Sequence, residues 1–194
     1  VGCELTIADC RLQTAESGGS RHRQPSTVNR QPATVNRPWS LPLLVATRTG
    51  YQNLCRLLTR MKLRAPKGEG ALALDELDGH VEGLVAVAGA ALLDTRQHGV
   101  GGLLDRLVGI FGRGNVYVGL SRHLDRDQEL QNELLVDLAA AYRVPIVATG
   151  GVRFATPDER PLHDIFTCLH HKTTLAGAGR RLGGNAEGYL PSRG

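Results

Sequence analysis

The chain has 194 residues, of which 41% are hydrophobic and 22% are charged, and its formal net charge is +4. This length and composition are those of an ordinary soluble globular protein, and we expect one domain around one core. Aromatic residues are only 4% of the chain, which argues against a base-stacking surface for single-stranded nucleic acid. The positive charge permits a DNA partner without requiring one.

Targeting signals and cysteine motifs are absent from the sequence. It has neither about 18 consecutive apolar residues nor a charged-then-apolar leader, which excludes a membrane span and a secretory signal. Cys3, Cys10, Cys55 and Cys168 form no CxxC pair and no zinc-finger spacing with histidine. Reduced thiols and a cytoplasmic location are therefore expected. The first residue is Val1, so we expect the chain to begin inside a longer product.

The first predicted element is a strand and turn over residues 1–12, with Glu4 as the one acid in an otherwise apolar run. From Thr14 to Pro38 the composition becomes polar, and two similar heptads, RQPSTVN (23–29) and RQPATVN (30–36), follow each other. A repeated polar heptad with proline cannot bury an apolar face. We therefore predict a mobile surface insert over 14–38.

A strand over 41–47 and a helix opened by Gly50 and Tyr51 come next. The apolar residues of this helix recur at steps of three and four, from Tyr51 to Met61. A separate stripe of Arg56, Arg60 and Arg64 could contact phosphates, although a solvated helix face is the commoner outcome.

The remaining chain alternates strands with helices. The predicted elements are a short helix over 72–77, a strand over 83–89, a helix over 100–111, a strand over 116–120, a helix from Asp125, a strand over 144–148, and a helix from Thr156 to about His171. This order predicts a parallel sheet covered by helices with right-handed crossovers. Periodicity does not separate an open sheet from a barrel.

The stretch VPIVATGGVRFATPDERPLHDIF (144–166) is the centre of the functional question. Its strand ends in Gly150 and Gly151, at the kind of strand end where β/α proteins carry their chemistry. The glycine pair could form an amide nest for phosphate, and a tight turn explains it equally well. No GxSxG, P-loop or GxGxxG motif is present in a suitable context.

Five stretches together resemble a known family: TRTGYQNLCRLLTR (47–60), LVAVAGA (84–90), NVYVGLSRH (115–123), VPIVATGGVRFATPDERPLHDIFTCLHHKTTL (144–175) and AGRRLGGNAEGYL (178–190). The family is the PHP domain of bacterial C-family DNA polymerases of the polymerase III alpha type, and the error-prone branch is the most similar. The resemblance implies an incomplete, distorted seven-stranded β/α barrel. Residues 1–190 would be a partial PHP domain, and 191–194 a tail towards a polymerase body outside this chain.

The resemblance also implies where a PHP metal site would lie. Glu4 matches the glutamate ligand, whereas the other ligand positions fall on Leu41, Ala90, Gly151 and Arg153. One carboxylate cannot hold a metal cluster, and an arginine repels a cation. We therefore expect no metal, cofactor or catalytic residue here. We also hypothesise that Arg153 pairs with Glu4 in place of the ion.

The leading prediction is a structural, non-catalytic module of a DNA polymerase (nucleotidyltransferase) acting in DNA replication, repair and translesion synthesis. Magnesium is expected only for the absent polymerase domain. The expected partners are the rest of the polymerase chain, DNA through that enzyme, and other replication or mutagenesis proteins, with no membrane. Five basic side chains could orient neighbouring domains or DNA: Arg153, Arg160, Lys172, Arg180 and Arg181.

Two alternatives stay open. One is a metal-dependent phosphoesterase that uses Glu4, His123 and His163. The other is a truncated gene product without activity, to which the repeat insert gives weight. Against the first, helix-surface and loop histidines are far commoner than histidine ligands.

Overall fold

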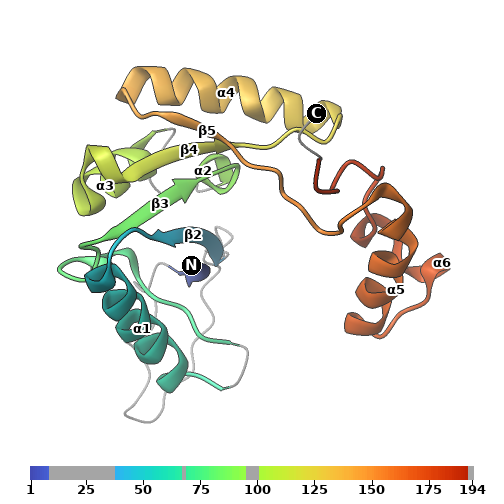
Figure 1. Cartoon of the computed structure of the whole chain (residues 1–194), viewed down its shortest axis with the longest axis horizontal. Helices are drawn as coiled ribbons and strands as arrows, with labels where there is room; N and C mark the ends of the chain where they lie inside the picture. Colours follow the sequence, from blue (N-terminus) through green and yellow to red (C-terminus); the bar gives the residue numbers. More distant parts are fainter. Residues whose placement is uncertain (9–37, 67–68, 95–100, 192–194) are drawn as a thin grey trace, which may run out of the picture.

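The computed structural model describes residues 1–8, 38–66, 69–94 and 101–191. The predicted insert (14–38) lies outside them except for Pro38, and so does the tail beyond Pro191. Five strands form one mixed sheet in the order β1-β2-β3-β4-β5 (Figure 1). Their bounds are β1 Gly2–Ile7, β2 Trp39–Val45, β3 Leu84–Ala88, β4 Val116–Leu120 and β5 Ile146–Ala148.

The helices fall close to their predicted positions. The α-helices are α1 Arg48–Leu63, α2 Ala91–Asp94, α3 Gly102–Phe111, α4 Arg126–Tyr142, α5 Arg160–His170 and α6 Leu175–Ala178. Short 3-10 helices are η1 Leu74–Leu77, η2 Arg113–Asn115, η3 Pro157–Glu159 and η4 Gly179–Arg181. Asp125 caps α4, and Thr156 and Pro157 open η3, which leads into α5. The α/β class is therefore confirmed.

The strand directions correct the expectation of a parallel sheet. β3, β4 and β5 are parallel and are joined by helical crossovers, as predicted. β1–β2 and β2–β3, however, are antiparallel. The β2–β3 connection contains α1, η1 and an extended residue, Leu72, that is bonded to the outer edge of β1 through Thr6 and Ala8. It is not a simple helical crossover, so the handedness and direction rules for βαβ units do not apply to it.

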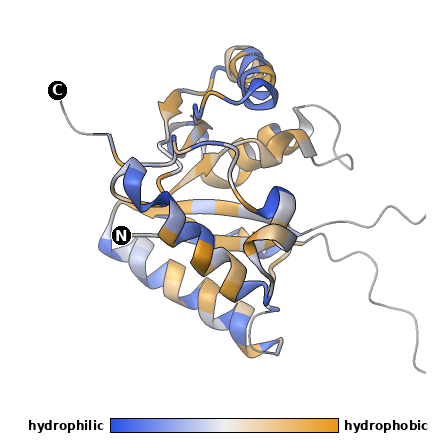
Figure 2. Ribbon diagram, turned by 90° about the vertical axis from the view of Figure 1, so that its right-hand side faces the viewer, coloured by the Kyte–Doolittle hydropathy of each residue, from blue (hydrophilic) through white to orange (hydrophobic). Residues whose placement is uncertain are grey.

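One face of the sheet carries the core. Leu5, Leu41, Leu43, Ala86 and Val116 point to this face and are 0% exposed. They pack against the apolar stripes of α1, α3 and α4, which belong to the same buried cluster. Figure 2 shows hydrophobic and hydrophilic positions alternating along the helices, as one-sided packing requires. The helices thus cover a single side of the sheet.

The other face of the sheet is apolar but poorly covered. Leu44, Val85, Val87, Tyr117 and Val147 alternate with the core positions and share this face through the strand register. Leu44 is 51% exposed and Val147 37% exposed, and the other three are half-buried. We call these five residues the open face.

The corner between β2 and α1 depends on two glycines. The hydroxyl of Thr47 caps α1 by accepting the backbone N–H of Gly50 at 3.1 Å, so α1 begins two residues before the predicted start. A Cβ on Gly50 would lie 1.9 Å from the carbonyl oxygen of Gly83, and Gly83 itself has φ +74°. Side chains at either position would push α1 off the sheet.

The segment after β5 forms a separate helical unit. Figure 1 shows α5 and α6 set to one side of the sheet, at the end of an extended connection from β5. We call residues 157–181 the C-terminal helical unit. Only two of its residues, Cys168 and Ala178, are buried. Its apolar stripe is exposed, and the residues of that stripe are Leu162, Ile165, Phe166 and Leu169.

Candidate ligand-binding site

A cavity of about 530 Å³ lies where the sheet meets the C-terminal helical unit. Its walls come from the residues after β4, the first turn of α4, the segment after β5, α5 and the loop 183–188. We call it the junction cavity. It lies at the carboxyl ends of the parallel strands β4 and β5, the edge at which α/β sheets usually bind ligands.

His123 is fixed by hydrogen bonds to both ring nitrogens. Its Nε2–H donates to the carbonyl of Gly150 at 2.9 Å, and its Nδ1 accepts from the Gln128 amide at 3.0 Å. The Gln128 carbonyl in turn accepts the His123 backbone N–H at 2.6 Å. Neither nitrogen is left for a metal or a proton transfer, so His123 joins the ends of β4 and β5 to α4.

This contact also explains the glycine pair. Gly151 has φ +52°, and a Cβ on it would lie 2.7 Å from the His123 ring. The glycine pair therefore permits a close histidine contact at a tight turn, which supports the turn explanation that was predicted beside the phosphate nest.

Asp164 is the most deeply covered ionisable group in the cavity wall. Its side chain is 14% exposed, and its Oδ2 lies 3.6 Å from the Nε of Arg160. Its Oδ1 is buried without a hydrogen-bond donor in the described part of the chain, and the Nδ1 of His163 is 3.8 Å away. A buried carboxylate oxygen without a donor is costly, because it has lost its water without gaining a hydrogen bond.

The cavity has an excess of positive charge. Arg126, Arg153 and Arg160 line it together with two carboxylates, those of Asp125 and Asp164. The Asp125 carboxylate accepts the N–H of Asp127 at 3.1 Å as the cap of α4, and Arg160 faces Asp164. Within the described residues no carboxylate pairs with Arg126 or Arg153, so two guanidinium groups remain for an anion.

The loop 183–188 forms one wall of the cavity and is held there by side chains. Asn185 donates to the His123 carbonyl, and Arg160 donates to that of Gly183. Gly188 accepts the backbone N–H of Arg153 at 2.8 Å. The backbone N–H groups of Gly183, Gly184 and Asn185 make no hydrogen bond to any other described residue, so the loop supplies unpaired donors.

The positions that the PHP resemblance assigns to metal ligands do not fit a metal. Leu41 is buried in the core, Ala90 and Gly151 have no donor side chain, and Arg153 lines the junction cavity. Over the described residues, no group of three or more His, Cys, Asp and Glu side chains is placed to hold an ion. We therefore derive no chemistry through a metal at these positions.

The hypothesised Glu4–Arg153 pair is not formed. Glu4 is exposed on β1 and its carboxylate accepts the Ser40 hydroxyl at 2.9 Å. β1 and β5 are opposite edges of the sheet, four strand spacings or roughly 19 Å apart along it. The prediction assumed that the strands close into a barrel, with Glu4 and Arg153 facing each other across its opening. The same separation keeps Glu4 from joining His123, so the described residues do not assemble the phosphoesterase set of Glu4, His123 and His163.

The other predicted basic residues divide into two groups. In the α1 stripe, Arg56 donates to Asn53 within the same helix. Arg64 pairs with Glu76 of η1, and Arg60 lies 3.3 Å from the His80 ring, so these two side chains hold α1 to the segment that follows it. In the C-terminal helical unit, Lys172, Arg180 and Arg181 are exposed.

Sequence reasoning missed Gln128, Asn185 and the loop amides. Gln128 is three residues after the cap of α4, and it turns back to the loop before the helix as a capping-box glutamine does. That spacing was a usable signal for Gln128. No local pattern indicated that residues 183–188 return to His123, 62 positions earlier than Asn185.

Comparison with known proteins identifies relatives with one name. The chain is 36% identical over 143 residues to an error-prone DNA polymerase of Rhodopseudomonas palustris, an alignment that covers 74% of this chain and 13% of that protein. It is 33% identical over 159 residues to an error-prone DNA polymerase of Pseudomonas syringae pv. tomato, with 77% and 14% covered. An error-prone DNA polymerase 1 of Agrobacterium fabrum is 35% identical over 143 residues, with 74% and 13% covered.

These alignments relate the chain to one segment of error-prone DNA polymerases. The chain spans only about one seventh of the length of these relatives. No protein-family profile matches it. Among the described helices, none combines the length and apolar character needed to cross a membrane.

Proposed function

We propose that this chain is a structural, non-catalytic PHP-type module of an error-prone DNA polymerase. The observation that carries the proposal is the alignment of about three quarters of the chain with a segment of proteins of that name. Nucleotidyl transfer and its magnesium are assigned to other parts of the parent enzyme, and DNA is proposed as a partner through that enzyme. The proposed role is replication and damage-tolerant synthesis in the bacterial cytoplasm.

The open face supports the finer proposal of an incomplete β/α barrel. In a closed barrel the inward face of every strand is filled by side chains from the other strands. Here that role fits the open face, which is apolar but half-exposed, because five strands do not close a ring. The exposed stripe of α5 fits the same proposal, since a further strand and helix would cover both surfaces.

The non-catalytic part of the proposal is supported by the chemistry of the strand ends. Leucine, alanine, glycine and arginine stand at the positions that the resemblance assigns to ligands. His123 has both ring nitrogens engaged. What remains at this edge can bind an anion, but it offers no activated nucleophile.

A chimaeric enzyme tests the proposal. The matching segment of the Rhodopseudomonas palustris relative is replaced by this chain, and primer extension on a DNA template is measured. We expect extension to be retained, because the chain would supply shape and contacts only. A chimaera that also carries Leu107→Ala, a change in the buried core, is the control and should lose activity.

The result that would reject the proposal concerns the isolated chain. If it hydrolyses a generic phosphate ester, and both a chelator and Glu4→Ala abolish the reaction, the phosphoesterase alternative replaces the structural module. A chimaera that folds but does not extend primers would also count against it.

A further inference from the structure

We infer that the junction cavity binds a phosphate ester of nucleotide size through Arg153, Arg126 and the amides of the loop 183–188. The inference concerns this chain alone and does not rest on the polymerase role. The cavity of about 530 Å³ is within the range of small-molecule sites.

The first argument is the charge of the donors. Arg153 and Arg126 line the cavity, and neither has a carboxylate partner among the described residues. A guanidinium group binds phosphate oxygens through two parallel hydrogen bonds, which are stronger than neutral ones. Arg153 also has its backbone held by Gly188, so its side chain projects from a fixed point.

The second argument is the loop. Gly183, Gly184 and Asn185 present backbone N–H groups that no other described residue accepts, and all three residues line the cavity. Successive free amides form concave anion sites in many proteins. Asn185 and Arg160 hold the loop through their own hydrogen bonds to the His123 and Gly183 carbonyls, so the amide donors are preorganised.

The third argument is the Asp164 carboxylate, which lines the cavity and has an Oδ1 atom without a donor in the described chain. That atom is covered, so a donor group of a ligand reaches it only when the Asp164 side chain rotates towards the cavity. A ligand that carries a hydroxyl or amino group beside its phosphate can then bond this carboxylate as well as the guanidinium groups. A nucleotide has this combination, and the Phe154 ring on the cavity wall offers it an apolar surface.

Calorimetric titration of the 194-residue chain tests the inference with three probes: inorganic phosphate, a deoxynucleoside monophosphate and a short single-stranded oligonucleotide. We expect the monophosphate to bind saturably and more tightly than inorganic phosphate. Tighter binding of the oligonucleotide would identify the phosphate as that of a DNA strand, and equal or weaker binding would identify a free nucleotide. Both results support the site.

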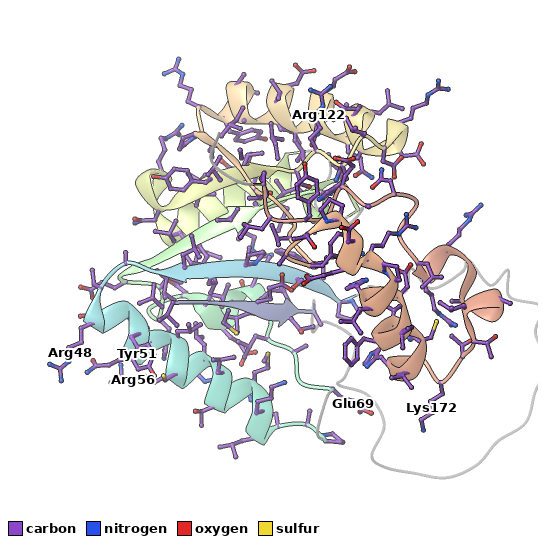
Figure 3. All side chains as sticks on the ribbon, turned by 45° about the vertical axis from the view of Figure 1, so that its right-hand side comes forward. Arg48, Tyr51, Arg56, Glu69, Arg122 and Lys172 are labelled. Atoms are coloured by element: carbon purple, nitrogen blue, oxygen red, sulfur yellow. The ribbon has the colours of Figure 1, made fainter. Side chains whose placement is uncertain are left out.

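Two matched pairs of variants locate the site. Arg153→Gln should weaken binding of the monophosphate by at least about tenfold, because a charged donor is lost. Arg48→Gln, at an exposed position of α1 that lies far in Figure 3 from Arg122, the residue before the cavity residue His123, should leave it unchanged. Gly184→Pro removes one amide donor and should weaken binding severalfold, whereas Gly184→Ala keeps the donor and meets nothing within 4 Å.

A fifth variant tests whether negative charge in the cavity opposes binding of the anion. Asp164→Asn removes a negative charge from the cavity, so inorganic phosphate should bind at least as tightly as in the unchanged chain. The unfolding midpoint of each variant is measured first, to confirm that it is folded. The inference fails if no probe binds saturably, if Arg48→Gln weakens binding as much as Arg153→Gln, or if Asp164→Asn weakens phosphate binding.

Discussion

The sheet with its helices and the C-terminal helical unit use apolar residues in opposite ways. Leu107 in α3 is 0% exposed, whereas Leu169 in α5 is 66% exposed, although both lie on apolar helix stripes. The same sequence pattern therefore yields a core in one region and an uncovered surface in the other. What differs is the size of the partner, because α3 packs on β3 and β4 whereas the main contacts of α5 with other described elements are those with the short helices α6 and η3.

The largest expected difference between the two regions is in the free energy of unfolding that is lost when a leucine is replaced by alanine. Leu107→Ala should lower the free energy of unfolding by about 2–5 kcal/mol, because it leaves a cavity in a packed core. Leu169→Ala should change it by less than about 0.5 kcal/mol, since that side chain is mostly in water. Urea unfolding of both variants measures the difference. Equal losses would mean that the stripe of α5 is covered in solution.

Removing a helix cap should also cost more stability in the sheet region than in the C-terminal helical unit, but the difference should be smaller than for the leucines. Thr47→Ala removes the cap of α1, a helix of 16 residues in contact with β2 and β3, and should cost about 1 kcal/mol. Thr174→Ala removes the cap of α6, which has four residues. Its effect should stay local, as faster amide exchange in α6 with little change in the unfolding midpoint. A shift of the midpoint as large as that of Thr47→Ala would show that the two regions unfold together.

The smallest effect is expected from the pH dependence of the contact between η1 and α1. Burial alone would raise the pKa of Glu76, but the Ala73 N–H and the Arg64 guanidinium outweigh burial and lower it below 4.5. A depressed carboxyl pKa stabilises the folded state above pH 4.5, and this contribution is lost as the pH falls through the lowered pKa. Glu76→Gln should thus lower the melting temperature slightly at pH 7 and hardly at all at about pH 3. If Glu76→Gln lowers the melting temperature by the same amount at both pH values, the effect comes from packing and not from charge.

Local patterns predicted most of the elements but not their arrangement. The three- and four-residue steps of α1, α3 and α4 and the alternation of β4 are properties of neighbouring residues, so the sequence displays them directly. The direction of β3 depends on the path of the described parts of the β2–β3 connection, including the bond between Leu72 and β1. Nothing within a few residues of β3 encodes that path.

The candidate site was only partly predictable for the same reason. The strand-end position of Arg153 was apparent from the chain, and the structure places that residue in the junction cavity. The predicted ion pair between Arg153 and Glu4 was wrong. Such a pair needs a closed barrel, and the five strands of the sheet do not close into one. The buried oxygen of Asp164 and the return of Asn185 to His123 are tertiary facts without a local signature.

The bond between Leu72 and β1 has a consequence for how copies of the chain can meet. It occupies the outer backbone groups of Thr6 and Ala8, whereas β5, at the other end of the sheet, is hydrogen-bonded only to β4 among the described residues. Strand addition is therefore open at one end of the sheet and obstructed at the other. Two molecules that joined through β5 would form a two-fold symmetric pair whose outer strands are both obstructed at Thr6 and Ala8, which disfavours growth into a fibre.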